Sequence, residues 1–184
     1  MSLPSPLRQF ARQSLAVLSI ALLALPASAQ PVVGEPAPDF TLPASDGETY
    51  RLADYVGKQA VVLAWFPRAF TSGCTIECKS LAENGHLIRE YDVQYFMASV
   101  DPLEKNREFA EDTGADFPLL SDEEKDAARA YGVLSPLGFA KRHTVYIGAD
   151  GTVLKVDTDI NPETAAQDMA ATLGELGVAR RSDS

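Results

Sequence analysis

The sequence is poor in positive charge, with 16 lysines and arginines against 26 aspartates and glutamates and a formal net charge of -10. Such acidity argues against nucleic acid or an anionic lipid surface as a partner. The sequence also contains no internal repeat and no low-complexity run. With 184 residues and 46% hydrophobic composition, the chain is long enough for one domain with a real core and short for two.

No apolar run is long enough to cross a bilayer comfortably, since the run at residues 15–25 has only eleven residues. It follows Arg8 and Arg12 and precedes Pro26 and the small residues 27–29. We expect residues 1–29 to be a cleaved secretory signal peptide and 30–184 the mature domain, in the periplasm or secreted. The segment has no Arg-Arg pair and no following cysteine, which favours general secretion without a lipid anchor. The alternative is an uncleaved N-terminal anchor.

Cysteine is equally scarce: the chain has two, Cys74 and Cys78. Cys74 follows Pro67, Thr71 and Gly73 where a strand is expected to end and a helix to begin. Thiols at helix N-termini ionise readily, and the thiolate is the reactive form. Thr71 is within reach of this sulfur, and Gly73 permits close approach of a substrate to the backbone.

In an exported protein, two cysteines usually form a structural disulfide. Two arguments weaken that interpretation here. Closing so short a loop removes little chain entropy. Positions i and i+4 of a helix also hold their Cβ atoms about 5–6 Å apart, whereas a disulfide requires about 3.8 Å. The pair therefore indicates a redox site, in which a bridge forms only if the first helical turn unwinds.

The remaining pattern alternates strands and helices. We expect strands at 61–65, 94–100, 117–120, 144–147 and 152–156, and helices at 74–91, 104–112, 123–131 and 161–176. The Asp46-Gly47 pair predicts a hairpin turn, and Asn161 and Pro162 are expected at the N-cap and first position of the last helix. This order predicts an α/β fold with a mixed central sheet flanked by helices. Cys74 then lies at the carboxyl end of a central strand, where open α/β sheets place their sites.

With these motifs in order, the chain resembles the peroxiredoxins, thiol-specific antioxidant proteins of the thioredoxin-fold superfamily, and among them the Q-type or bacterioferritin comigratory group. The resemblance covers roughly residues 32–177. It is carried by residues 33–42, by the P-x-x-x-T-x-x-C motif at 67–74, by 117–122 and by Arg142. It implies a thioredoxin-like fold and a peroxidase that reduces hydrogen peroxide and organic hydroperoxides without metal, haem or flavin. Electrons would come from a thiol donor such as a thioredoxin-like protein, and the enzyme would be a monomer or dimer, with no membrane contact after cleavage.

The resemblance also assigns roles at the site. Cys74 would be the peroxidatic cysteine, whose thiolate attacks the peroxide and becomes a sulfenic acid. Thr71 would hydrogen-bond the sulfur and the peroxide, Pro67 would shield the sulfenate from water, and Arg142 would stabilise the thiolate and the leaving oxygen. Glu77 fits the family's Cys-Thr-x-Glu pattern. It either orients an arginine or a backbone amide, or is a first-turn acid favoured by the helix dipole.

Cys78 departs from the pattern. Q-type peroxiredoxins that carry a resolving cysteine in this helix usually have four residues between the two thiols, and this chain has three. It also lacks the late cysteine of typical two-cysteine peroxiredoxins. Cys78 is expected to resolve the sulfenic acid by forming an intramolecular disulfide. The alternative is a one-cysteine enzyme that depends on an external thiol.

Two rival functions belong to other classes. Sco-type copper chaperones also carry C-x-x-x-C and a later histidine, here Cys74, Cys78 and His143, a donor set that suits copper. The prolines that follow the Sco cysteines are replaced by Thr75 and Lys79, and a cation site beside Arg142 would be opposed by its charge. A general thiol-disulfide oxidoreductase of the cytochrome-maturation type would need Cys-x-x-Cys, which is missing.

Overall fold

The computed structural model of the protein describes residues 31–181, so the predicted signal peptide lies outside the described residues. Its elements, in chain order, are β1 (Thr41–Pro43), β2 (Thr49–Arg51), a 3-10 helix (Leu52–Asp54), β3 (Ala60–Trp65), α1 (Ser72–Arg89), β4 (Val93–Ser99), α2 (Leu103–Thr113), β5 (Leu119–Ser121), α3 (Asp126–Ala130), β6 (His143–Ile147), β7 (Val153–Asp157) and α4 (Ala165–Glu175). Within the described range, no helix combines the length and apolar character needed to span a bilayer.

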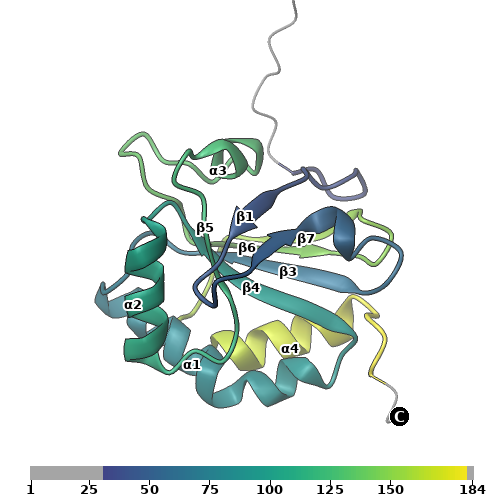
Figure 1. The fold of residues 1–184 in the computed structure, drawn as a ribbon. Coiled ribbons are helices and arrows are strands. Elements are labelled where there is room, and N and C mark those ends of the chain that lie inside the picture. The colour runs from purple at the N-terminus through teal and green to yellow at the C-terminus, as the bar shows by residue number, and fades with distance from the viewer. Residues whose placement is uncertain (1–30, 182–184) are drawn as a thin grey trace, which may run out of the picture.

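A five-stranded sheet in the order β5-β4-β3-β6-β7 forms the centre of the molecule (Figure 1). β3 pairs with β4 in parallel and with β6 in antiparallel orientation. Every residue of β3 is buried, as its continuous apolar, β-branched run predicts. The mixed α/β sheet expected from the sequence is therefore confirmed.

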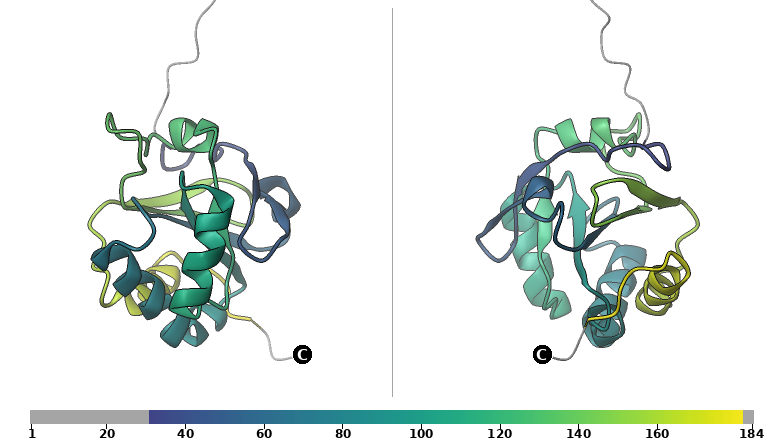
Figure 2. Two further views of the ribbon diagram at one scale, coloured as in Figure 1. Left: turned by 60° about the vertical axis from the view of Figure 1, so that its left-hand side comes forward. Right: turned by 90° about the vertical axis from the view of Figure 1, so that its right-hand side faces the viewer.

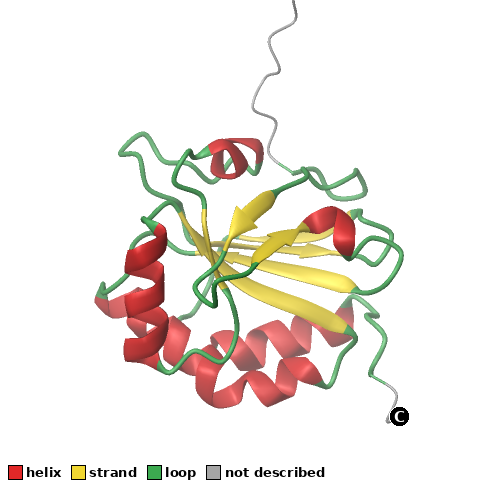
Figure 3. Cartoon of the chain, in the orientation of Figure 1, coloured by secondary structure: helices red, strands yellow, loops and turns green. Residues whose placement is uncertain are grey.

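The two faces of the sheet carry separate cores, because side chains alternate along each strand. Val62, Ala64 and Phe66 join the cluster formed with α1, α2 and α4, whereas Val61 and Trp65 join the cluster beneath the β1–β2 hairpin and α3. Figures 1 and 2 show α1 and α4 side by side on one side of the sheet. Figure 3 shows the small hairpin and α3 on the other.

The local turn signals are confirmed at two places. The Asp46-Gly47 turn joins β1 to β2, with Gly47 at φ 91°. The helix predicted at 104–112 ends close to the expected residue: α2 ends at Thr113, and Gly114 adopts the left-handed conformation and donates its N–H to the last-turn carbonyls.

The third predicted helix is shorter than expected. A helix over 123–131 was predicted, but α3 covers only Asp126–Ala130. The carboxylate of Asp122 accepts the N–H groups of Asp126 and Ala128 at 3.1 and 2.7 Å. Lys125 lies in the left-handed region at φ 64°. Asp122 thus caps the helix from outside and holds residues 123–125 in a turn.

The start of the last helix was also predicted wrongly. α4 begins at Ala165, with Thr164 as its N-cap. Asn161 does accept a backbone N–H, that of Glu163 at 3.1 Å, but this bond closes an Asx turn ahead of the helix. The Asn-Pro signal therefore marks a turn four residues before the first helical residue.

The end of α2 provides a test of backbone strain without a steric contribution. Gly114 has φ +67°, and no atom lies within 4 Å of the position that a Cβ would occupy. Gly114→Ala should lower the free energy of unfolding by about 1–2 kcal/mol, because only the left-handed conformation is penalised. Gly114→Asn should lose less, since asparagine tolerates this conformation. Urea unfolding followed by Trp65 fluorescence measures both, and equal losses would contradict this account.

Candidate active site

Cys74 lies in the first turn of α1, directly after the loop that leaves β3. Thr71 is the N-cap in extended conformation, and α1 begins at Ser72. Phe70, just before it, has φ 65°, which reverses the chain from strand to helix. The backbone N–H groups of a first helical turn have no intrahelical partner. The predicted position of Cys74, at a strand's carboxyl end and a helix N-terminus, is thus what the structure shows.

The sulfur of Cys74 is buried and contacts a cation. Arg142, just before β6, places Nη2 3.2 Å from Cys74 Sγ. The other end of the guanidinium, Nη1, forms an ion pair with Oε2 of Glu77. Glu77 is 1% exposed, and a carboxylate so deeply buried needs such a partner. Of the two roles left open for Glu77, orientation of an arginine is the one the geometry shows.

Gly73 has a role that the sequence did not reveal. A Cβ at this position would lie 3.2 Å from Arg142 Nη2, closer than ordinary contacts. The missing side chain therefore leaves space for the guanidinium over the first turn of α1. Only the three-dimensional position of Arg142, 68 residues after Cys74, makes this requirement visible.

Thr71 and Pro67 also lie in the loop before Cys74. The hydrogen bond of Thr71 differs from the one expected. The Thr71 hydroxyl donates to the carbonyl oxygen of Arg68 at 2.9 Å and not to the sulfur. Pro67 is half-buried. The proposed roles of Thr71 toward peroxide and of Pro67 as a shield stay predictions.

Asp101 is a second residue that sequence reasoning missed. Its Oδ2 accepts the N–H of Ala69 at 2.7 Å, and its Oδ1 accepts from Lys105 Nζ at 2.7 Å. Asp101 follows β4, the strand parallel to β3. The carboxylate thus ties the active-site loop to the neighbouring strand end, a contact between segments 32 residues apart that the sequence did not indicate.

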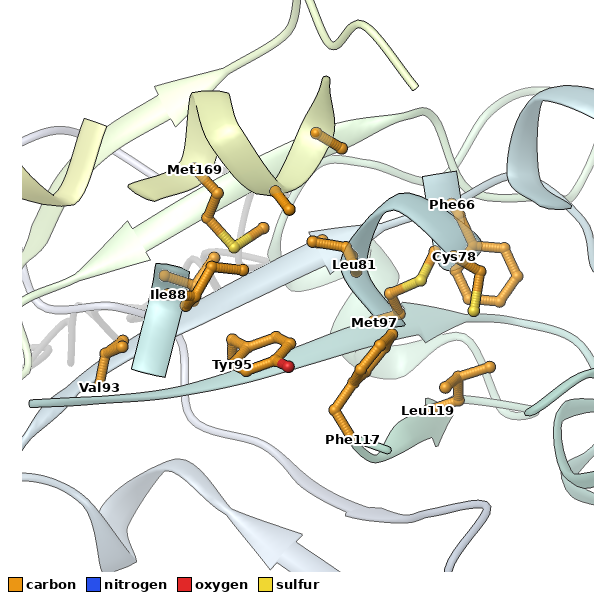
Figure 4. Close-up of a cluster of buried hydrophobic side chains, with 14 of the residues drawn as sticks. Phe66, Cys78, Leu81, Ile88, Val93, Tyr95, Met97, Phe117, Leu119 and Met169 are labelled. Carbon is orange, nitrogen blue, oxygen red and sulfur yellow. The ribbon is translucent and has the colours of Figure 1, made fainter. Parts of the chain in front are cut away.

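Cys78 lies one turn further along α1 and has a different environment. Its Sγ is 3.1 Å from Oγ1 of Thr113 on α2. Figure 4 shows it among the apolar side chains of Phe66, Leu81 and Met97. Burial raises the pKa of the Cys78 thiol to about 11. Both cysteines are free thiols.

His143 does not join the two cysteines. It pairs with Trp65 across β3 and β6, and strand alternation places it with Val145 and Ile147 on the face opposite α1. In the part of the chain that the structure describes, no group of three or more His, Cys, Asp or Glu side chains could hold a metal ion. The donor set required for the copper hypothesis is therefore not assembled.

Comparison with known proteins shows the family of this chain. The model of the AhpC/TSA family matches residues 33–156. The chain belongs to this family. It is thus a peroxiredoxin of the thioredoxin-fold superfamily, as the motifs predicted.

Curated relatives and solved structures to which the chain is similar are also peroxiredoxins. Peroxiredoxin Bcp of Escherichia coli (strain K12) is 35% identical over 133 residues, which cover 68% of this chain and 85% of the relative. Peroxiredoxin Bcp of Bacillus subtilis (strain 168) is 33% identical over 128 residues, covering 69% and 79%. The crystal structure of peroxidoxin BcpB from Mycobacterium tuberculosis has a TM-score of 0.73 and 32% identity, covering 83% of this chain and all of that one. The thioredoxin-like fold is thereby confirmed.

The ion pair between Arg142 and Glu77 allows its structural and chemical effects to be separated. Arg142→Met leaves a buried carboxylate unpaired and should lower the free energy of unfolding by about 3–5 kcal/mol. Adding Glu77→Gln should recover most of this loss, because no buried charge remains. Reaction with peroxide, followed by stopped-flow fluorescence, should stay slow in the double variant, since the donor to Cys74 is still missing.

The control is Arg107→Met, which removes an exposed arginine paired with Glu104 and should change stability by under about 0.5 kcal/mol. Should the double variant react with peroxide as fast as the parent protein, Arg142 has a structural role only.

Proposed function

We propose that the protein is a thiol peroxidase that reduces hydrogen peroxide and organic hydroperoxides at Cys74. The observation that carries this proposal is the contact of Arg142 Nη2 with Cys74 Sγ at the start of α1. A guanidinium donor contacts the sulfur, and Cys74 lies in a first helical turn, whose N–H groups have no intrahelical partner. Donors placed at this point stabilise the negative charge that develops on oxygen during peroxide cleavage.

In the first step, the Cys74 thiolate attacks the terminal oxygen of the hydroperoxide. The S–O bond forms as the O–O bond breaks, giving a cysteine sulfenic acid and an alkoxide or hydroxide that takes a proton to leave as alcohol or water. Arg142 can donate to the sulfur before attack and to the departing oxygen afterwards. Glu77 holds the guanidinium in place through Nη1, which leaves Nη2 directed at the reacting atoms.

In the second step, Cys78 attacks the sulfenic sulfur. The S–S bond forms, the S–O bond breaks, and the Cys78 proton leaves with the hydroxyl as water. Because i and i+4 positions of an intact helix are too far apart for a disulfide, the first turn of α1 must unwind for this step. A thiol donor such as a thioredoxin-like protein then reduces the disulfide, and the competing route is direct reduction of the sulfenic acid by an external thiol.

Export to the periplasm or beyond is part of the proposal. It is supported by the sequence of residues 1–29, with its positive start, short apolar run and small residues before the cleavage site. An intact mass that begins after residue 29 in a periplasmic or secreted fraction tests it. Recovery of the full-length chain in the membrane fraction would indicate the uncleaved anchor instead.

The two cysteines should have separable roles. Cys74→Ser should abolish peroxide consumption, because the attacking sulfur is gone. Cys78→Ser should consume one equivalent of peroxide rapidly and then turn over no further in the absence of an external thiol, apart from slower over-oxidation of Cys74. Peroxide consumption and intact-mass spectrometry should show a Cys74–Cys78 disulfide in the parent protein and oxygen adducts at Cys74 in Cys78→Ser.

Three other results would change the assignment. Equal loss of the first equivalent in both variants would reject Cys74 as the attacking thiol. A stable Cys74 sulfenic acid beside a free Cys78 in the parent protein would make this a one-cysteine peroxidase. Tight Cu(I) binding that needs Cys74, Cys78 and His143, with no peroxide consumption, would replace the peroxidase by a copper chaperone.

A further inference from the structure

Thr113, the last residue of α2, makes an unusual set of contacts. Its hydroxyl oxygen lies 2.6 Å from the carbonyl oxygen of Phe109 and 3.1 Å from Cys78 Sγ. A hydroxyl has one proton to donate, and a carbonyl can only accept. The short contact with Phe109 therefore takes the Thr113 proton, and Thr113 Oγ1 faces the sulfur as an acceptor. It follows that the S–H of Cys78 is the donor.

The sheet order places the partners of the two sulfurs on opposite sides. Arg142, the partner of Cys74, precedes β6, whereas Thr113, the partner of Cys78, ends α2, which packs against β5. β6 and β5 lie on opposite sides of β3 in the sheet. Two thiols of one helix are thus held by two different parts of the fold, and neither contact brings the sulfurs together.

We propose that Thr113 is a positioning residue for the resolving step: it holds Cys78 as a thiol against α2, and this hydrogen bond must break before Cys78 attacks the sulfenic acid of Cys74. The inference rests on the proposed function, and within it on Cys78 as the resolving thiol. In the reaction itself, the released S–H proton leaves with the sulfenic hydroxyl as water while the S–S bond forms.

The surroundings of Cys78 favour the same protonated state. Burial is the largest effect and raises the pKa of Cys78 to about 11; the neighbouring Cys74 sulfur adds to it, and the contact with Thr113 acts in the opposite direction without reversing the shift. Tyr95, on β4, is a titratable group that interacts with Cys78, and burial raises its own pKa to about 12, so it stays neutral. When Cys78 departs, Thr113 keeps its bond to Phe109, and no buried donor is left without a partner. Breaking the hydrogen bond between Cys78 and Thr113 therefore costs little free energy and is reversible.

The hydrogen bond then controls a competition at Cys74. While Cys78 is held, the sulfenic acid can meet a second peroxide and become a sulfinic acid; once Cys78 is free, it becomes a disulfide. A stronger hydrogen bond between Cys78 and Thr113 gives more sulfinate at a given peroxide concentration. Thr113 contacts neither peroxide nor the Cys74 sulfur in this scheme and acts only through Cys78.

The test compares Thr113→Val, which keeps the shape and removes the acceptor, with Thr113→Ser, which keeps the hydroxyl. Reduced protein is mixed with hydrogen peroxide, and disulfide and sulfinate are quantified by quenching and intact mass. Thr113→Val should form the disulfide about 3- to 10-fold faster after sulfenic acid formation, as loss of one net hydrogen bond implies, with correspondingly less sulfinate. Thr113→Ser should match the parent protein. Should Thr113→Val unfold, Thr113→Ala carries the same comparison.

Unchanged or slower disulfide formation in Thr113→Val overturns the inference, as does an equal change in Thr113→Ser. A parent protein that consumes peroxide at Cys74 but forms no Cys74–Cys78 disulfide also overturns it, while the peroxidase proposal stands. If the parent protein consumes no peroxide at all, the proposed function itself fails. These results are distinguishable because the first and second steps are measured in the same reaction.

Discussion

The buried ion pair of Arg142 and Glu77 is the constraint on which the site depends. It joins α1 to the segment before β6 across 65 residues of sequence. Glu77 neutralises the guanidinium locally, so Arg142 contributes to Cys74 mainly as an oriented donor and less as an unbalanced charge. The positive end of the α1 dipole and the unpaired N–H groups of its first turn add a field that does not depend on this pair. Gly73 completes the arrangement by leaving space for the guanidinium.

The two cysteines occupy one helix face but have opposite electrostatic environments. Cys74 has a cationic donor on its sulfur, the Nη2 of Arg142. Cys78 has an acceptor on its proton and apolar side chains around it, and burial raises its pKa to about 11. Sequence spacing alone gives two similar thiols one turn apart. Their different surroundings come from Arg142, just before β6, and from Thr113 on α2.

Sequence patterns predicted the elements whose causes are local. The apolar run of β3, the Asp-Gly turn and the end of the helix predicted at 104–112 were found where expected or within a residue of it, because each depends on neighbouring residues. The short α3 was not predicted, since its cap is Asp122, upstream of the residues whose pattern indicated helix. The partner of Cys78 was hidden, and an arginine partner for Glu77 was only one of the roles left open, because both partners come from distant elements. Local propensity does not contain that information.

The part of α1 that must unwind is held by a few specific polar contacts more than by apolar packing. Phe70, Thr71 and Ser72 are exposed, whereas Leu81 and Ile88 further along are fully buried in the core shared with α4. The left-handed conformation of Phe70 adds strain that opening would release. Opening the first turn therefore exposes little apolar surface beyond Cys74 and Cys78 themselves. The energetic barrier to bringing the sulfurs together then resides in a few specific contacts, those of Arg142 and Thr113, and local chemistry at the sulfurs can govern when the turn opens.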